Sequence, residues 1–510
     1  MAATLAAPTT MPTNDQATDT KLSDKPAPVE RIVNTEHKLQ IGKKTLEYTA
    51  SCGTLLLREP DAGDTKSGDG KEAYKGEKAR ATVFFIAYTL KRNGKKDAAR
   101  PLTFSFNGGP GSSSVWLHLG LLGPQRVPCD DKGHCGAPPH QLTDNEYSLL
   151  SDSDLVFIDP VGTGHSRVAE GEKPAEFHDY QRDLDSVGEF IRLYLTRNER
   201  WGSPKYLIGE SYGTTRAAGL ARHLQEQHDI YLNGLMLVSL AMDFQTLSFD
   251  HGNDLPYPLY LPTYAATAWY HQALRPTLQN KPLKEVVAAA EAFANGDYTL
   301  ALMQGSRLPE AERQHIAEQL AMYSGLSTEF VLRCRLRVDE FRFFKELLRA
   351  RGQTVGRLDA RFLGLDKDDA GEHPEEDASM NQLIGAYAAG INRLLVEKLD
   401  YRSDSPYLVH APLWKTWSWK GFENKYIAAG DSLRRALHAN PDMRVYVASG
   451  YYDLATPHAA GDYTLSHLGL HHSLQDRIQV SYFEAGHMMY IHQPSLARMA
   501  GELRAFVAQG

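Results

Sequence analysis

The stretch KYLIGESYGTTRAAGLARHLQEQ, residues 205–227, contains a single serine, Ser211, between two glycines. Three apolar residues before Gly209 predict a strand, and the run rich in Ala and Leu after Gly213 predicts a helix. This pattern is typical of a nucleophile elbow, a tight strand-to-helix turn that exposes a serine hydroxyl at the end of a sheet. We expect the two glycines to relieve crowding at the turn. On these residues alone, an ordinary strand–helix turn with a solvated serine is an equally good interpretation.

Further strands are expected on both sides of this turn. Segments rich in β-branched and aromatic residues predict strands at residues 54–59, 81–90, 101–106, 153–160, 234–241, 443–450 and 478–486. Residues 179–200 carry apolar side chains at spacings of three and four, which predicts an amphipathic helix. Apolar strands that alternate with helices are typical of a mostly parallel sheet that is covered by helices on both faces.

A mainly helical block interrupts this alternation and divides the chain. We predict a mobile N-terminal tail at residues 1–44, rich in Ala, Thr and Pro, followed by the first part of an α/β core at 45–244. Residues 245–430 are interpreted as an inserted helical cap, because strand patterns resume only after them. The second part of the core is then expected at residues 431–510.

Length, composition and charge exclude several classes of protein. The 510 residues are 42% apolar and 23% charged, as in ordinary globular proteins. The 55 basic and 63 acidic residues give a net charge of −8, which argues against a general nucleic-acid-binding protein. No apolar run approaches 18 residues, so no membrane span is expected. The first residues lack the pattern of a secretory signal, which favours a cytoplasmic protein or a chain that is already processed.

The four cysteines are too few for a disulfide framework. Cys129 and Cys135 flank a turn-like stretch and form either a small disulfide or two free thiols, and their spacing leaves both interpretations open. That spacing does not match the usual zinc pairs, so no metal site is expected here.

A nucleophilic serine needs a general base, and the base needs an acid that orients it. In α/β-hydrolase sheets these residues follow in the order Ser, Asp, His, after late strands. Asp453 follows the strand expected at 443–450, and His487 follows the last strand. Each alone has an ordinary explanation, as a turn-forming aspartate or a surface histidine. Their order and local context together predict a Ser211–His487–Asp453 triad.

The transition state of acyl transfer also needs hydrogen-bond donors for its oxyanion. One donor is expected to be the backbone N–H of Tyr212, directly after the nucleophile. The other is expected in the loop FNGGPGSSS, where Gly108, Gly109 and Gly111 allow the backbone to approach a substrate closely. We assign this second donor to Gly109. A phosphate-binding loop is disfavoured because no Gly-Lys-Ser/Thr follows.

Several blocks of the chain resemble the serine carboxypeptidase family (peptidase family S10), and the chain is similar to a bacterial-type member. These blocks follow in the family order and read FNGGPGSSSVWLHLGLLGP (106–124), VFIDPVGTGHS (156–166), YLIGESYG (206–213), VYVASGYYDLATP (445–457) and FEAGHMMY (483–490). The combination is far more specific than any single block.

The resemblance implies an α/β-hydrolase fold with a mostly parallel central sheet flanked by helices and an inserted cap. It implies a serine-type carboxypeptidase that acts on peptides with a free C-terminus and uses no cofactor. The residues that it implies are catalytic Ser211, Asp453 and His487, an oxyanion hole at Gly109 and Tyr212, Asn107 and Glu210 as hydrogen-bond partners of the substrate's C-terminal carboxylate, and Met488 in the leaving-residue pocket. Gly108 completes the predicted substrate-binding set.

The chain departs from the eukaryotic family pattern at the carboxylate-binding network. Ser105 stands where those members usually have Trp, and Leu121 stands where they have Glu. An anion bound next to a carboxyl group requires that group to be protonated, because like charges repel. With Leu121 in place of one carboxyl, we expect an activity optimum less acidic than is usual in the family.

Three other functions remain open on the sequence. The departures at Ser105 and Leu121 keep open a serine esterase, or an acyltransferase in which an alcohol replaces water. A prolyl-type aminopeptidase also uses a Gly-Gly-Pro-Gly loop, but its elbow usually differs from GESYG. A non-catalytic binding protein on the same scaffold is disfavoured by the complete set of Ser, Asp and His.

Overall fold

A single large sheet organises the molecule, whose computed structural model describes residues 29–60, 76–92, 95–97 and 99–509. Within these residues the sheet has eleven strands. Nine strands lie in the spatial order β1 (Ile32–Ile41), β2 (Lys44–Pro60), β3 (Glu77–Arg92), β8 (Asp154–Ile158), β5 (Leu102–Phe106), β10 (Lys205–Ser211), β11 (Gly234–Leu240), β14 (Arg444–Gly450) and β15 (Ile478–Phe483). The short strands β4 (Lys95–Lys96) and β9 (Arg167–Val168) pair with β3.

The sheet is antiparallel at one end and parallel at the other. Strands β1, β2, β3 and β8 pair antiparallel, whereas β8, β5, β10, β11, β14 and β15 pair parallel. Strand β8 lies between β3 and β5, although it follows β5 in the chain. This order, with helical crossovers between the parallel strands, is that of an α/β-hydrolase fold, so the predicted fold class is confirmed.

Helices cover both faces of the sheet because its strands are apolar on both sides. Alternate residues of β10 belong to different cores, since Tyr206 and Ile208 pack in one cluster and Leu207 in the other. The helices of one face are α2 (Tyr180–Arg197), α3 (Tyr212–His228) and α12 (Gly430–Ala439), and those of the other are α1 (Val115–Leu117), α11 (Ala378–Arg393) and α14 (Gln493–Ala508).

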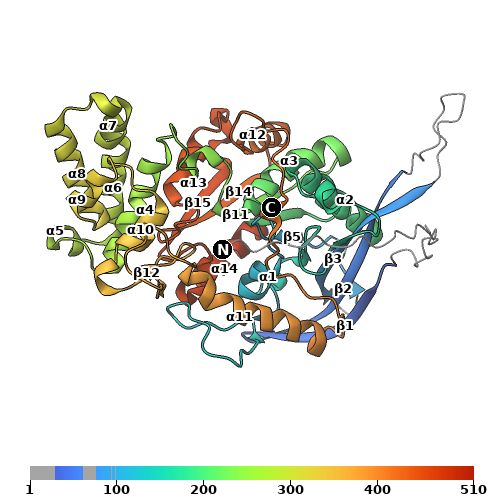
Figure 1. The fold of residues 1–510 in the computed structure, drawn as a ribbon. Coiled ribbons are helices and arrows are strands. Elements are labelled where there is room, and N and C mark those ends of the chain that lie inside the picture. Colours follow the sequence, from blue (N-terminus) through green and yellow to red (C-terminus); the bar gives the residue numbers. More distant parts are fainter. Residues whose placement is uncertain (1–28, 61–75, 93–94, 98, 510) are drawn as a thin grey trace, which may run out of the picture.

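The inserted cap has a hydrophobic core of its own. Its helices, at the left in Figure 1, are α4 (Pro256–Tyr270), α5 (Pro276–Gln279), α6 (Leu283–Phe293), α7 (Thr299–Gln304), α8 (Glu310–Ser324), α9 (Thr328–Arg333) and α10 (Glu340–Glu346). Tyr451, Tyr452 and Leu454, which follow β14, pack in this core and join the cap to the sheet. Helix α13 (His458–Ser466) lies next to α4.

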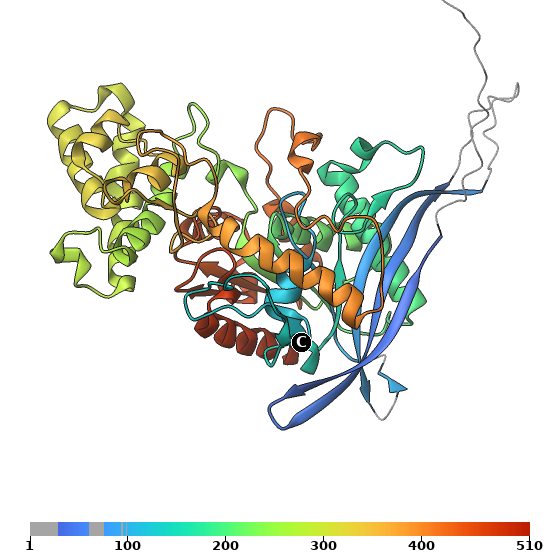
Figure 2. The same ribbon diagram turned by 60° about the horizontal axis from the view of Figure 1, so that its bottom comes forward.

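The last part of the insertion packs on the hydrolase core. Helix α11 contributes Leu383, Tyr387 and Ile391 to one of the two cores that flank the sheet, and Figure 2 shows this helix running across the molecule. The short strand pairs β6 (Gln125–Arg126) with β7 (Thr143–Asp144) and β12 (Thr354–Val355) with β13 (Leu363–Gly364) lie in the connections around it. The chain segment after α11 also pairs with the core, since Ser112 forms a β-bridge with His410.

The predicted N-terminal tail differs from the structure in its last part. Strand β1 occupies Ile32–Ile41, inside the range 1–44, and pairs antiparallel with β2. Its residues alternate between exposed and half-buried, so the strand has no fully apolar face that would distinguish it from a polar segment. Residues 1–28 lie outside the described residues. Among the described residues, no helix is long and apolar enough to cross a membrane.

Candidate active site

Ser211 lies at a sharp turn between β10 and α3, as the sequence predicts. Its backbone has φ 60° and ψ −130°, a conformation that non-glycine residues rarely adopt and that is often found at active sites. Helix α3 begins at the next residue, Tyr212. A Cβ atom on Gly209 would overlap the carbonyl oxygen of Gly213, and one on Gly213 would lie 3.0 Å from the carbonyl oxygen of Phe106. The two glycines therefore permit the turn by leaving space for the neighbouring backbone.

Asp453 and His487 meet at the carboxyl-terminal edge of the parallel strands. Asp453 follows β14 and His487 follows β15, and His487 Nδ1 lies 2.8 Å from Asp453 Oδ2. Both side chains are buried. The other carboxylate oxygen of Asp453 accepts hydrogen bonds from the backbone N–H groups of Ala455 and Thr456, both at 2.9 Å. These bonds fix the carboxylate so that one oxygen faces the imidazole.

Two further hydroxyl groups hold this pair, and the sequence analysis did not identify them. Thr456 Oγ1 donates to Asp453 Oδ2 at 2.7 Å and lies 3.2 Å from His487 Nδ1. Ser239, at the end of β11, donates its hydroxyl to the backbone carbonyl of His487 at 2.6 Å. A Thr three residues after an Asp in a strand-end loop is a recognisable local signal, because such side chains often bond nearby backbone and carboxylate groups. Ser239 has no comparable signal.

The electrostatic surroundings of His487 favour its protonated form. Burial lowers the pKa of His487, but the charge and hydrogen bond of Asp453 and the charge of Glu210 raise it, and the net shift is upward. Among the described residues, no hydrogen bond joins Ser211 to His487. Such hydrogen bonds are often long or poorly aligned until a substrate binds.

The glycine loop after β5 lies directly against the elbow. A Cβ atom on Gly108 would lie 2.5 Å from the backbone nitrogen of Tyr212 and 2.7 Å from the carbonyl oxygen of Glu210. Gly109 has φ 108°, and in the described part of the chain its N–H has no hydrogen-bond partner. The N–H of Tyr212 is the first of helix α3, where backbone N–H groups have no intrahelical acceptor. The two predicted oxyanion donors are therefore close to each other and to Ser211.

Asn107 and Glu210 form a hydrogen-bonded pair beneath this loop. Asn107 Nδ2 donates to Glu210 Oε1 at 2.9 Å, and Asn107 Oδ1 accepts from the N–H of Leu117 at 3.2 Å. Burial raises the pKa of Glu210 to about 7, although the nearby His487, Tyr490 and Asn107 act in the opposite direction. The Tyr490 hydroxyl lies close enough to Glu210 to interact with its carboxyl group, and it favours the ionised form. This carboxyl group therefore keeps its proton to a higher pH than an ordinary glutamate does.

A buried arginine supports the same loop and was missed by the sequence analysis. Arg216 is only 1% exposed, and its guanidinium donates to the carbonyl oxygen of Asn107 at 2.6 Å and to Asp183 Oδ2 at 2.8 Å. Asp183, on α2, also accepts a hydrogen bond from the Tyr212 hydroxyl at 2.9 Å. Arg216 thus connects α2, α3 and the glycine loop. In the sequence, Arg216 follows the elbow by about one helical turn, and nothing distinguishes it from any other arginine on a helix.

The three remaining residues of the sequence interpretation are buried. Ser105 is buried in β5, and its hydroxyl has no partner among the described residues. Leu121 packs in the core of one face of the sheet. Met488 directly follows His487 and packs in the same core, so its predicted place in a leaving-residue pocket stays a prediction.

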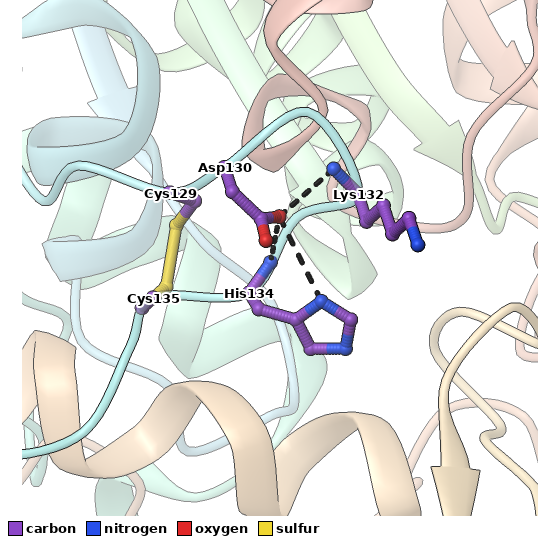
Figure 3. The surroundings of a disulfide bond; sticks show 5 residues. All are labelled: Cys129, Asp130, Lys132, His134 and Cys135. Atoms are coloured by element: carbon purple, nitrogen blue, oxygen red, sulfur yellow. Dashed lines mark hydrogen bonds and ion pairs between the residues drawn. A yellow bond between two sulfur atoms is a disulfide. The ribbon is translucent and has the colours of Figure 1, made fainter.

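A disulfide bond closes the loop between Cys129 and Cys135, which the sequence left open (Figure 3). Inside the loop, one oxygen of Asp130 accepts hydrogen bonds from the backbone N–H groups of Lys132 and His134, at 2.8 and 2.9 Å. The His134 ring packs against Phe362 in the segment that follows β12, with ring centroids 4.9 Å apart. Among the described residues, no group of three or more His, Cys, Asp or Glu side chains is arranged to hold a metal ion.

Comparisons with known proteins agree with the blocks found in the sequence. The model of the serine carboxypeptidase family matches residues 73–277, which include Ser211 and the glycine loop but neither Asp453 nor His487. The pheromone-processing carboxypeptidase KEX1 of Yarrowia lipolytica is 32% identical over 171 residues, which are 32% of this chain and 25% of that protein. Serine carboxypeptidase-like 36 of Arabidopsis thaliana is 30% identical over 186 residues, which are 33% of this chain and 35% of that protein.

The matched segments therefore span about a quarter to a third of the length of these relatives. Among solved structures, the prohormone-processing carboxypeptidase Kex1(delta)p of Saccharomyces cerevisiae is similar over 90% of this chain and 92% of that chain. The TM-score is 0.49 and the sequence identity is 18%.

Proposed function

We propose that this chain is a serine-type carboxypeptidase that hydrolyses C-terminal peptide bonds through an acyl-enzyme, and the match of residues 73–277 to the serine carboxypeptidase family supports this proposal. One observation carries the proposal: the buried His487–Asp453 pair lies at the same sheet edge as the Ser211 elbow and the glycine loop. A serine at a strained turn, a histidine with an orienting carboxylate and two free backbone donors are the components that acyl transfer requires.

In the proposed reaction, the Ser211 hydroxyl attacks the carbonyl carbon of the last peptide bond. His487 takes the serine proton and then gives it to the leaving amine, which breaks the C–N bond and leaves an ester on Ser211. Water attacks this ester, again with His487 as the base, and restores the free serine. Asp453 keeps the His487 Nδ1 protonated, so that Nε2 remains available to accept the proton.

The backbone N–H groups of Gly109 and Tyr212 are proposed to bind the oxyanion of the tetrahedral intermediate. Their proximity is supported by the contact between Gly108 and the Tyr212 nitrogen, which brings the glycine loop against the first turn of α3. The partial positive charge at the N-terminus of a helix adds to this stabilisation. Losing one such donor typically costs about 2.7–4 kcal/mol of barrier.

Asn107, Gly108 and Glu210 are proposed to bind the C-terminal carboxylate of the peptide, with Met488 next to the leaving residue. Glu210 can sit beside an anion only while it carries its proton, and its pKa of about 7 keeps much of it protonated at neutral pH. This binding therefore weakens as the pH rises through about 7. Activity also falls at low pH, because His487 must be neutral to act as a base.

The first test separates a serine hydrolase from a binding protein and a carboxypeptidase from an esterase. We expect a fluorophosphonate probe to label the protein and Ser211→Ala to abolish labelling. We expect a blocked dipeptide with a free C-terminus to be cleaved, and its C-terminal amide to be cleaved much more slowly. Loss of Ser211 should lower kcat by roughly 10⁴-fold or more. Labelling that persists in Ser211→Ala would contradict the proposed nucleophile.

The second test uses pH to probe the role of Glu210. With a free-carboxylate peptide, kcat/KM should describe a bell with its alkaline limb near pH 7, whereas an ester substrate without that carboxylate should lack this limb. Glu210→Gln should remove the alkaline limb for the peptide and leave the ester profile unchanged there, because an amide needs no proton to accept an anion nearby. A peptide profile that peaks well below pH 5 would contradict the proposal.

An esterase or acyltransferase remains the second candidate, and one observation favours it. Leu121, in the buried helical turn His118–Leu122 that follows α1, has an apolar side chain where the family pattern has a carboxyl group, so no carboxyl at this position can share a proton with Glu210. Such a site has fewer hydrogen-bond donors for a C-terminal carboxylate. Cleavage of the ester but not of the free-acid dipeptide would support this candidate and remove the carboxypeptidase assignment.

A further inference from the structure

Residues 357–361, which we call the clasp, connect the cap to both loops that carry the acid and the base. The clasp lies between β12 and β13. The carbonyl oxygen of Arg357 accepts a hydrogen bond from the N–H of Leu454 at 3.1 Å, and the N–H of Ala360 donates to the carbonyl oxygen of Tyr452 at 3.0 Å. These two bonds hold the residues on either side of Asp453.

The same segment holds the backbone of His487. The N–H of His487 donates to the carbonyl oxygen of Leu358 at 2.6 Å, and the N–H of Gly486 donates to Asp359 Oδ2 at 3.1 Å. A Cβ atom on Gly486 would lie 2.5 Å from Asp359 Cβ and from the Leu358 carbonyl oxygen, so a side chain there would displace the clasp. The clasp therefore bonds to both catalytic loops through neighbouring residues.

Asp359 is itself held by a buried ion pair. Arg361 Nε and Nη2 donate to the two oxygens of Asp359 at 2.9 and 2.6 Å, and both side chains are almost completely buried. Such a fork-shaped pair fixes the carboxylate plane. His271 directly follows α4, and its Nε2 lies 2.6 Å from the carbonyl oxygen of Ala360, which anchors the clasp to the helices of the cap.

We propose that the clasp is a positioning element of the active site, and that Asp359 is the residue through which the cap fixes His487 against Asp453. This inference rests on the proposed function, because it assigns a role relative to the catalytic pair. According to this proposal, the inserted cap positions the catalytic residues, in addition to any role in covering the active site. Asp359 acts through Gly486 and is a positioning residue, with no contact to the reacting atoms required.

The proposal has a consequence for proton transfer. The groups that face His487 electrostatically are Asp453 and Glu210, which raise its pKa, and Arg357, which lowers it. If the bond from Gly486 to Asp359 is lost while the bond between Leu454 and Arg357 keeps Arg357 in place, the imidazole moves away from Asp453 and loses part of the interaction that favours the cation. The acid limb of the activity profile should then shift to lower pH, while the rate falls. A purely structural role would lower stability and leave the limb in place.

The experiment compares three variants of the full chain. Asp359→Ala removes the acceptor of the Gly486 N–H, whereas Asp359→Asn retains one oxygen for it and loses the ion pair with Arg361. Asp366→Asn is the matched control. Asp366 forms a similarly buried ion pair with Lys345, and Lys345 also donates to the carbonyl oxygen of Asp368, so all three residues lie within the cap. For each variant, the rate and stoichiometry of fluorophosphonate labelling are measured from pH 5 to 9, with thermal unfolding recorded in parallel.

We expect Asp359→Ala to slow labelling about 100-fold, the scale of a 1 Å misplacement, with full stoichiometry and an acid limb at lower pH. Asp359→Asn should remain within about tenfold of the unmodified chain, with a smaller shift in the same direction. Asp366→Asn should lower the unfolding temperature and leave the limb unchanged. If Asp359→Ala does not fold, the comparison of Asp359→Asn with Asp366→Asn decides.

An acid limb that stays at the same pH in both Asp359 variants would overturn the positioning role. So would an equal shift in Asp366→Asn, because that would show a general response to a loosened cap. The outcome is distinct from a failure of the proposed function. If the unmodified chain does not react with the probe at Ser211, the proposed function fails first, whereas normal labelling with unshifted Asp359 variants removes only this inference.

Discussion

The two sides of the candidate active site are built in different ways. The Ser211 side depends on contacts between β5, β10 and α3, where Gly108, Gly209 and Gly213 let backbone segments approach one another. The His487 side depends on hydrogen bonds from the clasp, which belongs to an insertion between β11 and β14. One side is thus a property of the core sheet, whereas the other joins the core to the cap.

This difference predicts different sensitivities. On the Ser211 side, the nearest neighbours of each glycine are backbone atoms, which cannot move without disturbing the strand or the helix. On the His487 side, the contacts are hydrogen bonds between loops, supported by an ion pair within the clasp, and they can loosen without unfolding the sheet. Substitutions on the first side should therefore act through steric displacement, and those on the second through orientation and proton transfer.

The largest effect is expected from Asp453→Asn, which breaks the His487 side at its acid. The amide can keep the hydrogen bonds from Ala455 and Thr456 through its oxygen, but its NH₂ group then faces His487 Nδ1. This stabilises the tautomer whose proton is on Nε2, which cannot accept the serine proton. We expect kcat to fall about 10⁴-fold with little change in unfolding temperature.

The control for this prediction is the pH profile of the residual activity. Hydroxide can replace the disabled base, so the Asp453→Asn activity should rise with pH above 8. A loss of less than about tenfold would show that Asp453 does not orient His487.

The next effect is expected from Gly108→Ala, which breaks the Ser211 side. The new methyl group would lie 2.5 Å from the Tyr212 nitrogen and 2.8 Å from the Gly213 nitrogen, so the loop must move away from the elbow. This displaces one oxyanion donor, and kcat should fall about 10²- to 10³-fold. Gly501→Ala, in the exposed part of α14 with open space around the site, is the matched control and should keep full activity. Equal activity in both variants would contradict the predicted oxyanion hole.

The two sides also differ in how far the sequence predicts them. The sequence predicts the elbow and the positions of Asp453 and His487 because each of these features follows an apolar strand. Parallel strands bring their carboxyl ends to one edge of the sheet, which places the three features near one another. The glycine loop is predicted for the same reason, because it follows the apolar strand β5. These features depend on local patterns whose spatial consequence is fixed by the fold class.

The clasp could not be predicted in this way. Asp359 and Gly486 are 127 residues apart, and neither lies in a pattern that selects the other. Arg216 likewise looks like a solvent-exposed helical arginine until α2 places Asp183 beside it. Strand β1 is not distinguished from a tail because its residues alternate between exposed and half-buried and form no fully buried face. In each case the deciding interaction is tertiary, with a partner that a single sequence does not indicate.

The smallest effect is expected from Thr456→Val, which sharpens the comparison because it changes the His487 side without touching the clasp. Valine has nearly the same shape, but it cannot donate to Asp453 Oδ2, where the threonine hydroxyl now lies at 2.7 Å. A hydrogen bond to a charged group contributes about 1.5–3 kcal/mol, and part of it is replaced by the bonds from backbone N–H groups. We therefore expect kcat/KM to fall about tenfold, with KM unchanged.

Thr464→Val is the matched control, because that buried hydroxyl donates only to the Ala460 carbonyl within α13. If the two variants lose the same activity, Thr456 contributes only to folding, and orientation of the catalytic pair must be assigned to Ser239 and the clasp.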